Sequence, residues 1–265
     1  MAAVAVPAMW VDRNIVQEDG FVALTGPLGT DPVFRQRLAT AAVGGLGSDR
    51  IPEALTELAR PILESAATSL TSLPGYPEAW TETLRKSHRL SFADPNTLPA
   101  EIDGVSSLTL DVAPLVGLVA QQVAEATSLP LEAPDQVLIN IGQSNQRQLL
   151  ERVSAYAPMG YAVGVGAVIA FALALVAARR RWTVLAGAGV GALVLAGVWK
   201  LGSDAAGAAA ARTKSGKEVA EIFKREFVAA ATGSFGQWIL VAAVVGGILL
   251  ALGLVLRVVG GRRRA

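Results

Sequence analysis

Three long stretches without a charged residue constrain this chain more than any other feature. They run over residues 158–178, 183–199 and 237–256, and Ala, Gly, Val and Leu dominate each of them. About 20 apolar residues in a helix cross the hydrocarbon core of a bilayer. The sequence therefore predicts an integral membrane protein with transmembrane helices at about 158–178, 183–201 and 237–258, and with a loop over 202–236.

The chain divides into parts of different composition. Residues 11–156 interleave charged and apolar residues, as a soluble domain does, and they are numerous enough to bury one core. Residues 157–265 are expected to form the transmembrane domain. Residues 1–10 are apolar but too short to span a bilayer. We expect them to be the remnant, or outer half, of a first transmembrane helix that begins before Met1, which would give four spans and two cytoplasmic termini.

The pattern within residues 11–156 predicts a mainly α fold. Asp31-Pro32 is typical of a helix start, and further helices are expected over about 52–73, from Pro77, over 114–127 and over 144–156. Two short alternating segments, SLTLD at 107–111 and QVLINI at 136–141, predict strands. We therefore expect an extracytoplasmic helical domain with a small two-stranded ribbon, followed by a transmembrane helix bundle.

The orientation follows from cations that have no acidic neighbours. Such cations occur in the turn between the first two spans and after the third span: Arg179, Arg180, Arg181, Arg262, Arg263 and Arg264. Cytoplasmic loops carry an excess of Lys and Arg. We expect a multi-pass protein of the cell membrane, with its C-terminus in the cytoplasm and residues 11–156 and 202–236 outside.

The segment before the third span is amphipathic. Val219, Ile222, Phe223 and Phe227 fall on one side of a helix. Such a helix can pack against the N-terminal domain or lie on the membrane surface. Packing against the domain is the interpretation that we favour.

The most distinctive polar pattern is Trp80-x4-Arg85-x2-His88, to which Asp111 can be added. A ligand-binding or catalytic cluster would use His88 as a general base with an Asp partner. We favour structural roles, in which Trp80 and His88 pack together with a hydrogen-bonded imidazole. Asp111 would then cap the following helix or pair with Arg85 or His88.

Composition limits the chemistry that the chain can carry. It has one histidine, no cysteine and a net charge of +1. Thiolate and polyhistidine metal sites, disulfides and a general electrostatic attraction to nucleic acid are therefore excluded. No nucleotide, phosphate or serine-nucleophile motif occurs. We expect no cofactor and no metal, and we name no catalytic residue.

Glycines one helical turn apart occur in two of the spans. Gly160-x3-Gly164 and Gly187-x3-Gly191 each give a helix face that permits close approach of a second helix. Packing within the chain is the preferred interpretation, and association of two copies is the alternative. The interiors of the spans contain no charged residue, since Lys200 lies at an edge, and this disfavours an ion or proton carrier.

The chain resembles a group of actinobacterial multi-pass integral membrane proteins of unassigned function. The resemblance rests on VDRNIVQEDGFVALTGPLGTDP, PEAWTETLRKSHRL, LTLDVAPLVGLV and the RRRW turn, and it covers most of the chain. It implies one N-terminal span, an outer helical domain and three C-terminal spans. It implies no particular chemistry.

These observations favour a non-enzymatic protein of the cell envelope, whose outer domain binds a ligand or partner or acts as a scaffold. One alternative is an accessory subunit of a transporter or envelope-synthesis complex. Another is an envelope enzyme that uses His88 with an Asp. The expected partners are the lipid bilayer, another membrane or envelope protein, and a second copy of the chain.

Overall fold

The computed structural model describes residues 2–36, 69, 72–92, 109–127, 134–140, 152–212 and 218–262. The chain separates into two compact units. Unit 1 comprises Met1–Arg13, Ser154–Arg212 and Val228–Ala265, and unit 2 comprises Asn14–Val153 and Thr213–Phe227. The fold is mainly helical with one small two-stranded sheet, as the sequence predicts.

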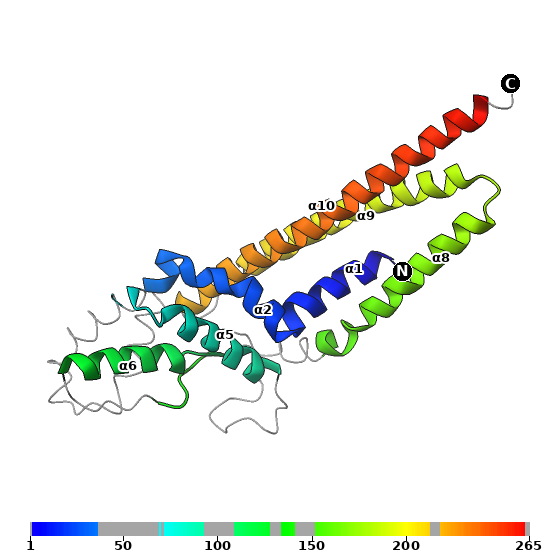
Figure 1. Cartoon of the computed structure of the whole chain (residues 1–265). Helices are drawn as coiled ribbons and strands as arrows, with labels where there is room; N and C mark the ends of the chain where they lie inside the picture. The colour runs from blue at the N-terminus through cyan, green and yellow to red at the C-terminus, as the bar shows by residue number, and fades with distance from the viewer. Residues whose placement is uncertain are drawn as a thin grey trace. The chain divides into compact units, whose positions relative to one another are not determined.

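Unit 1 contains the three long apolar helices (Figure 1). They are α8 (Met159–Ala177), α9 (Arg181–Arg212) and the C-terminal helix α10 (Glu218–Arg262), of which residues 228–262 belong to this unit. Each is long and apolar enough to cross a membrane. The protein is therefore a membrane protein with three helices of this kind in the described part of the chain.

The segment over 202–236, expected as the connection between the second and third spans, is largely helical. Residues 202–212 continue α9, and residues 218–236 belong to α10. Ala-rich sequence favours helix, and Ala is frequent here. Unit 1 resumes at Ser154, close to the expected boundary at 156, whereas Thr213–Phe227, expected in the transmembrane domain, belongs to unit 2.

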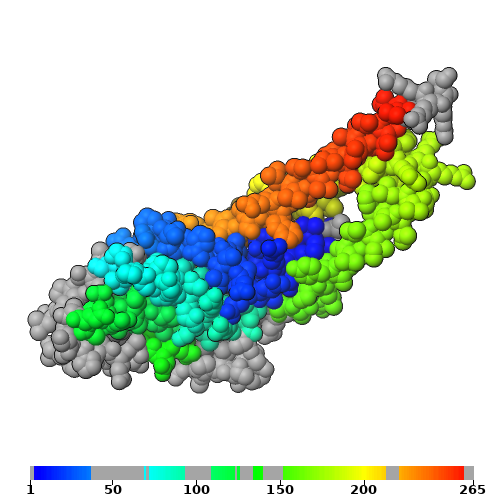
Figure 2. All heavy atoms as spheres, in the orientation of Figure 1, coloured from blue at the N-terminus to red at the C-terminus, as the bar shows by residue number. Residues whose placement is uncertain are grey.

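The apolar surface of α8 is uncovered over much of its length. Val165, Val168, Leu173 and Val176 are all more than half exposed. Figure 2 shows this helix as an open yellow-green surface. An exposed apolar surface of this extent is expected where a helix faces lipid.

Two of the predicted packing glycines do lie at a helix contact. The short helix α1 (Ala2–Val11) packs along α8. A Cβ added at Gly160 would lie 2.8 Å from Ala8 Cβ and 2.9 Å from Met9 N, and one at Gly164 would lie 3.5 Å from the Met9 side chain. The absence of side chains at these positions therefore permits the close approach of α1.

The second predicted pair is not at a helix contact within the described part of the chain. Gly187 and Gly191 have open space around them among the described residues. The glycine that packs α9 onto α10 is Gly189, where a Cβ would lie 2.5 Å from Leu250 N and 2.6 Å from Gly246 O. The prediction chose the wrong face of α9, since every face of this helix is apolar and rich in small residues.

Unit 2 is built around α5 (Tyr76–Phe92) and α6 (Ala113–Thr127), with the short strands β1 (Thr109–Asp111) and β2 (Leu138–Asn140). The strands pair antiparallel, with Leu110 opposite Ile139. The ribbon expected from residues far apart in the sequence is therefore present. The fully buried side chains of this core come from several elements: Phe34, Leu84, Leu110, Val112, Leu115, Val116 and Val119.

Residues from Asn14 onward complete unit 2. The chain makes a π-helix (Asp12–Val16), then α2 (Glu18–Thr25), then a 3-10 helix, η2 (Gly26–Thr30). Asp31 Oδ1 accepts a hydrogen bond from Phe34 N at 2.7 Å, so it caps the helical turn that follows.

Two expected helices fall largely outside the described residues. They are the remainder of the helix from Asp31 and the helix over about 52–73. Of the helix expected over 144–156, only residues 152–156 are described as helical, and a turn at Ala157-Pro158 separates them from α8.

The amphipathic start of α10 packs in the core of unit 2. Ile222 and Phe223 are 4% and 6% exposed. The Phe223 ring lies 6.1 Å from the Phe34 ring, and the Phe227 ring lies 6.1 Å from the Phe21 ring. The segment therefore packs against the N-terminal domain, which is the alternative that the sequence favours.

Candidate functional site

His88 is buried on α5 and bonded to the backbone. Its side chain is 6% exposed, and Nε2 donates a hydrogen bond to Ile15 O at 3.0 Å. Its ring lies 4.5 Å from that of Phe92 and 5.2 Å from that of Phe21. Burial lowers the pKa of His88, against a smaller opposing effect of the hydrogen bond to Ile15. The imidazole is therefore held neutral, as a donor to a carbonyl of the π-helix.

The carbonyl that His88 binds belongs to the π-helix (Asp12–Val16). A wider helical turn interrupts the regular hydrogen bonding of a helix, and such turns are frequent at functional sites. His88 supplies a hydrogen-bond donor to one carbonyl of this turn, that of Ile15.

Trp80 lies on the same face of α5 and binds the loop after α2. Its Nε1 donates to Gly26 O at 3.0 Å, and its ring meets that of Phe34 edge-on at 5.4 Å. Tyr76, one turn earlier, donates its hydroxyl to Gly29 O at 3.1 Å, and burial raises the pKa of Tyr76 to about 12. The two aromatic side chains thus hold η2 against α5.

Asp111 connects the ribbon to α6. Its Oδ1 accepts hydrogen bonds from Ala113 N at 3.0 Å, in the first residue of α6, and from Val137 N at 3.1 Å, just before β2. Its own backbone N–H donates to Ser87 Oγ at 2.9 Å. The Asp111 side chain is 2% exposed. The carboxylate therefore accepts backbone hydrogen bonds at the start of a helix and just before a strand.

Arg85 lies at the edge of the cluster and faces Glu18. Its Nε is 3.8 Å from a Glu18 oxygen, and Arg89, one turn later, makes the closer contacts at 2.9 and 3.1 Å. The hydrogen bond from Arg89 lowers the pKa of Glu18. Both arginines are well exposed, so this pairing is a surface contact between α2 and α5.

The four predicted residues thus occupy separate positions around one helix and one ribbon. Sequence reasoning missed Ser87, Arg89 and Glu18, which supply contacts to this group. Arg89 had a readable signal, since it lies four residues after Arg85 and so on the same helix face. Ser87 and Glu18 had none, because their partners are distant in the sequence.

The distribution of acidic and histidine side chains bears on metal binding. Among the described residues, no group of three His, Asp or Glu side chains is placed to hold a metal ion.

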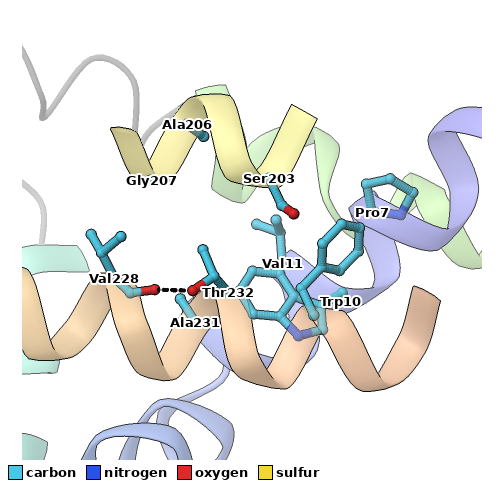
Figure 3. A pocket seen from close by; sticks show the side chains of 10 residues that line it. Pro7, Trp10, Val11, Ser203, Ala206, Gly207, Val228, Ala231 and Thr232 are labelled. Atoms are coloured by element: carbon cyan, nitrogen blue, oxygen red, sulfur yellow. Dashed lines mark hydrogen bonds between the residues drawn. The ribbon is translucent and has the colours of Figure 1, made fainter. Parts of the chain in front are cut away.

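A second candidate site is an apolar pocket in unit 1. It has a volume of about 300 Å³ and lies between α1, α9 and α10. Figure 3 shows Pro7 and Trp10 of α1 on one side, Ser203 of α9 on another, and Val228 and Thr232 of α10 below. The residues that line it are Pro7, Trp10, Val11, Ser203, Ala206, Gly207, Val228, Ala231, Thr232 and Phe235.

The sequence contained little sign of this pocket. Its three walls come from segments about 190 and 25 residues apart, and their residues are ordinary apolar helix positions. No protein-family model, no curated protein and no solved structure matches the chain.

Proposed function

We propose that this chain is a multi-pass membrane protein of the cell envelope, with unit 2 outside the cytoplasm as a non-enzymatic domain. Unit 2 would bind a ligand or partner or act as a scaffold for assembly. The position of His88 supports this proposal most directly. The one imidazole of the chain is buried and bonded to a backbone carbonyl.

An enzyme that uses His88 with an Asp would need a different arrangement. A general base must reach the proton of a substrate in a cleft. His88 is enclosed by the rings of Phe21 and Phe92, and Asp111 Oδ1 already accepts two backbone hydrogen bonds. These contacts favour a stabilising role for both residues, and they leave the surface of unit 2 as the feature available for recognition.

The runner-up function is an accessory subunit of a transporter or envelope-synthesis complex. The open face around Gly187 and Gly191 favours it, because small residues on an unoccupied face of a membrane helix permit a second helix to approach closely. The two functions differ in where the partner binds: on unit 2 for the scaffold, and on α9 for the accessory subunit.

Site-specific photocrosslinking in native membranes distinguishes them. A photoreactive amino acid is placed at exposed positions of unit 2, Glu78 on α5, Gln121 on α6 and Asp135 before β2, and in parallel at Gly187 on α9. Lipid-facing Val176 on α8 serves as the control position. We expect one discrete protein adduct from unit 2 and none from Val176.

Adducts from Gly187 and none from unit 2 would favour the accessory subunit over the scaffold. Recovery of the protein without any adduct would contradict both a protein partner of unit 2 and the accessory subunit, and would favour a self-contained receptor or enzyme. A His88→Ala variant that keeps the adduct, measured in parallel, would show that this side chain is not part of the recognition surface.

A further inference from the structure

We propose that the apolar pocket between α1, α9 and α10 holds one acyl chain of a membrane lipid. The proposal concerns unit 1 alone and does not depend on what unit 2 binds. It rests on the level of the pocket along the spans, on the polarity of its walls and on the surface that surrounds it.

The pocket lies where the apolar spans end. The uncharged part of α10 runs from Phe227 to Leu256, which are 30 residues. At 1.5 Å per residue this is about 45 Å, the thickness of a bilayer with its headgroup layers. Val228 to Phe235 form the first turns of that stretch, opposite the end where Arg257 follows. On α9, the lining residues Ser203, Ala206 and Gly207 lie on either side of Asp204, which forms an exposed ion pair with Lys200.

Aromatic side chains mark the same level. Trp10 lines the pocket, and its ring lies 5.4 Å from the Phe235 ring, which lies 6.4 Å from the Trp199 ring. Trp Nε1 atoms in this group donate to Ser234 Oγ and to Ala3 O. Trp is enriched at the boundary between lipid tails and headgroups, because its ring is apolar and its N–H is polar. The pocket therefore lies at the edge of the hydrocarbon region.

The hydroxyl groups of the pocket walls donate to the helix backbone. Ser203 Oγ donates to Lys200 O at 3.0 Å, and Thr232 Oγ1 donates to Val228 O at 2.8 Å, as Figure 3 shows for Thr232. The Trp10 N–H is likewise bonded to Ser234. A polar ligand would lose its hydration here without gaining donors from these three side chains. A hydrocarbon chain has no hydrogen bonds to lose on entry, and it contacts the apolar walls in place of neighbouring lipid tails.

Exposed apolar residues occur on α9 and α10 near the pocket along each helix. Ala206 in its wall is exposed, and so are Val198 and Leu201 on α9 and Leu240 on α10. A lipid tail can therefore enter along apolar surface without crossing water. A volume of about 300 Å³ is at the small end for ligand pockets and suits part of one chain, not a whole lipid.

The test uses the full chain in nanodiscs of phosphatidylethanolamine and phosphatidylglycerol, with some phosphatidylglycerol carrying a diazirine at the end of one acyl chain. After irradiation, the crosslinked peptides are mapped by mass spectrometry. We expect adducts on the pocket residues of α1 and α10. Gly207→Leu should fill the pocket and reduce these adducts to the level seen without irradiation.

Matched variants separate loss of the pocket from loss of structure. Gly202→Leu places the same side chain on α9 in open space, outside the lining, and should keep the adducts. Gly207→Ala should also keep them, because its Cβ would make ordinary contacts of 3.7 and 3.8 Å with Thr232 and Val228. Ala231→Leu fills the pocket from α10 and provides a second loss variant if Gly207→Leu does not fold.

Three results would overturn the proposal. The first is equal labelling of the pocket residues in the parent chain, Gly207→Leu and Ala231→Leu. The second is labelling that is confined to lipid-facing residues such as Val176 of α8. The third is labelling by a diazirine in the lipid headgroup but not by one at the end of the tail, which would place a headgroup there instead.

Discussion

At the scale of single residues, the side chains that look most suited to chemistry stabilise the backbone. His88 donates to Ile15 O, Trp80 donates to Gly26 O, and Asp111 accepts from Ala113 N and Val137 N. Polar groups that are buried need such partners, and most side-chain hydrogen bonds in proteins are made to backbone or water. The pattern of residue types alone does not separate this use from catalysis.

The lowered pKa of His88 makes stability depend on pH. The unfolded chain binds a proton near the ordinary value of 6.5, and the folded chain binds one only at a lower pH. The unfolded state therefore holds more protons between these two values, so the free energy of unfolding should fall as the pH drops below about 6.5.

Chemical unfolding of the full chain in detergent micelles, followed by Trp fluorescence across this pH range, measures the effect. His88→Gln keeps a donor near Ile15 O but has no group that titrates there. The variant should lose most of the pH dependence between 6.5 and the lower folded value. Parallel curves for the parent chain and His88→Gln would show that the dependence has another source.

Gly29 tests the contact that Trp80 makes with η2. A Cβ at Gly29 would lie 2.6 Å from Trp80 Nε1, so Gly29→Ala must displace the indole or the loop. We expect Gly29→Ala to destabilise the protein by about 1–3 kcal/mol. Gly26→Ala is the matched control, since Gly26 has right-handed helical backbone angles and open space around it. Thermal unfolding of both variants measures the difference, and equal melting temperatures would contradict it.

At the scale of helices and strands, amphipathic segments were readable from sequence and uniformly apolar ones were not. The face of α5 that carries Trp80, Leu84 and His88 is the buried one, as its spacing predicts. The same holds for Ile222 and Phe223 at the start of α10. In α9, by contrast, all faces are apolar, and the choice of contact face depends on which small residues oppose each other.

Gly189 tests this account of α9. Gly189→Ala would place a Cβ against backbone atoms of Leu250 and Gly246, so the two helices must separate. We expect a loss of about 1–3 kcal/mol in stability, as for other overpacked contacts. Gly187→Ala, two residues earlier and in open space, should change little. Thermal unfolding in nanodiscs measures both, and the reverse order would show that α9 packs through Gly187.

At the scale of the whole molecule, neither compact unit is formed by one continuous stretch of the chain. Both are assembled from stretches that are distant in sequence, and α10 contributes residues to each. Unit 2 is therefore not a contiguous N-terminal domain, because Thr213–Phe227 belongs to it. A deletion of residues 11–150 alone would leave Phe223 without the ring of Phe34.

The orientation of the whole molecule can be tested directly because the chain has no cysteine. Single cysteines are placed at Asp135 in unit 2 and at Arg180 between α8 and α9, both exposed positions. In intact cells, a membrane-impermeant maleimide should label Asp135→Cys but not Arg180→Cys, because the Arg-rich turn is expected in the cytoplasm. Both should react after the membrane is permeabilised. Labelling of Arg180→Cys alone in intact cells would invert the orientation.

The sequence by itself determined that the chain has helices long and apolar enough to cross a membrane, and that unit 2 is mainly helical with a small ribbon. Length, apolarity and helical periodicity are local properties, and they predict an element without reference to its neighbours. Only the tertiary structure decided that His88 donates a hydrogen bond to the Ile15 carbonyl and that Gly189, not Gly187, packs against α10. It also decided that a pocket lies between α1, α9 and α10. Each of these depends on residues brought together from distant segments, and no local pattern specifies which segments will meet.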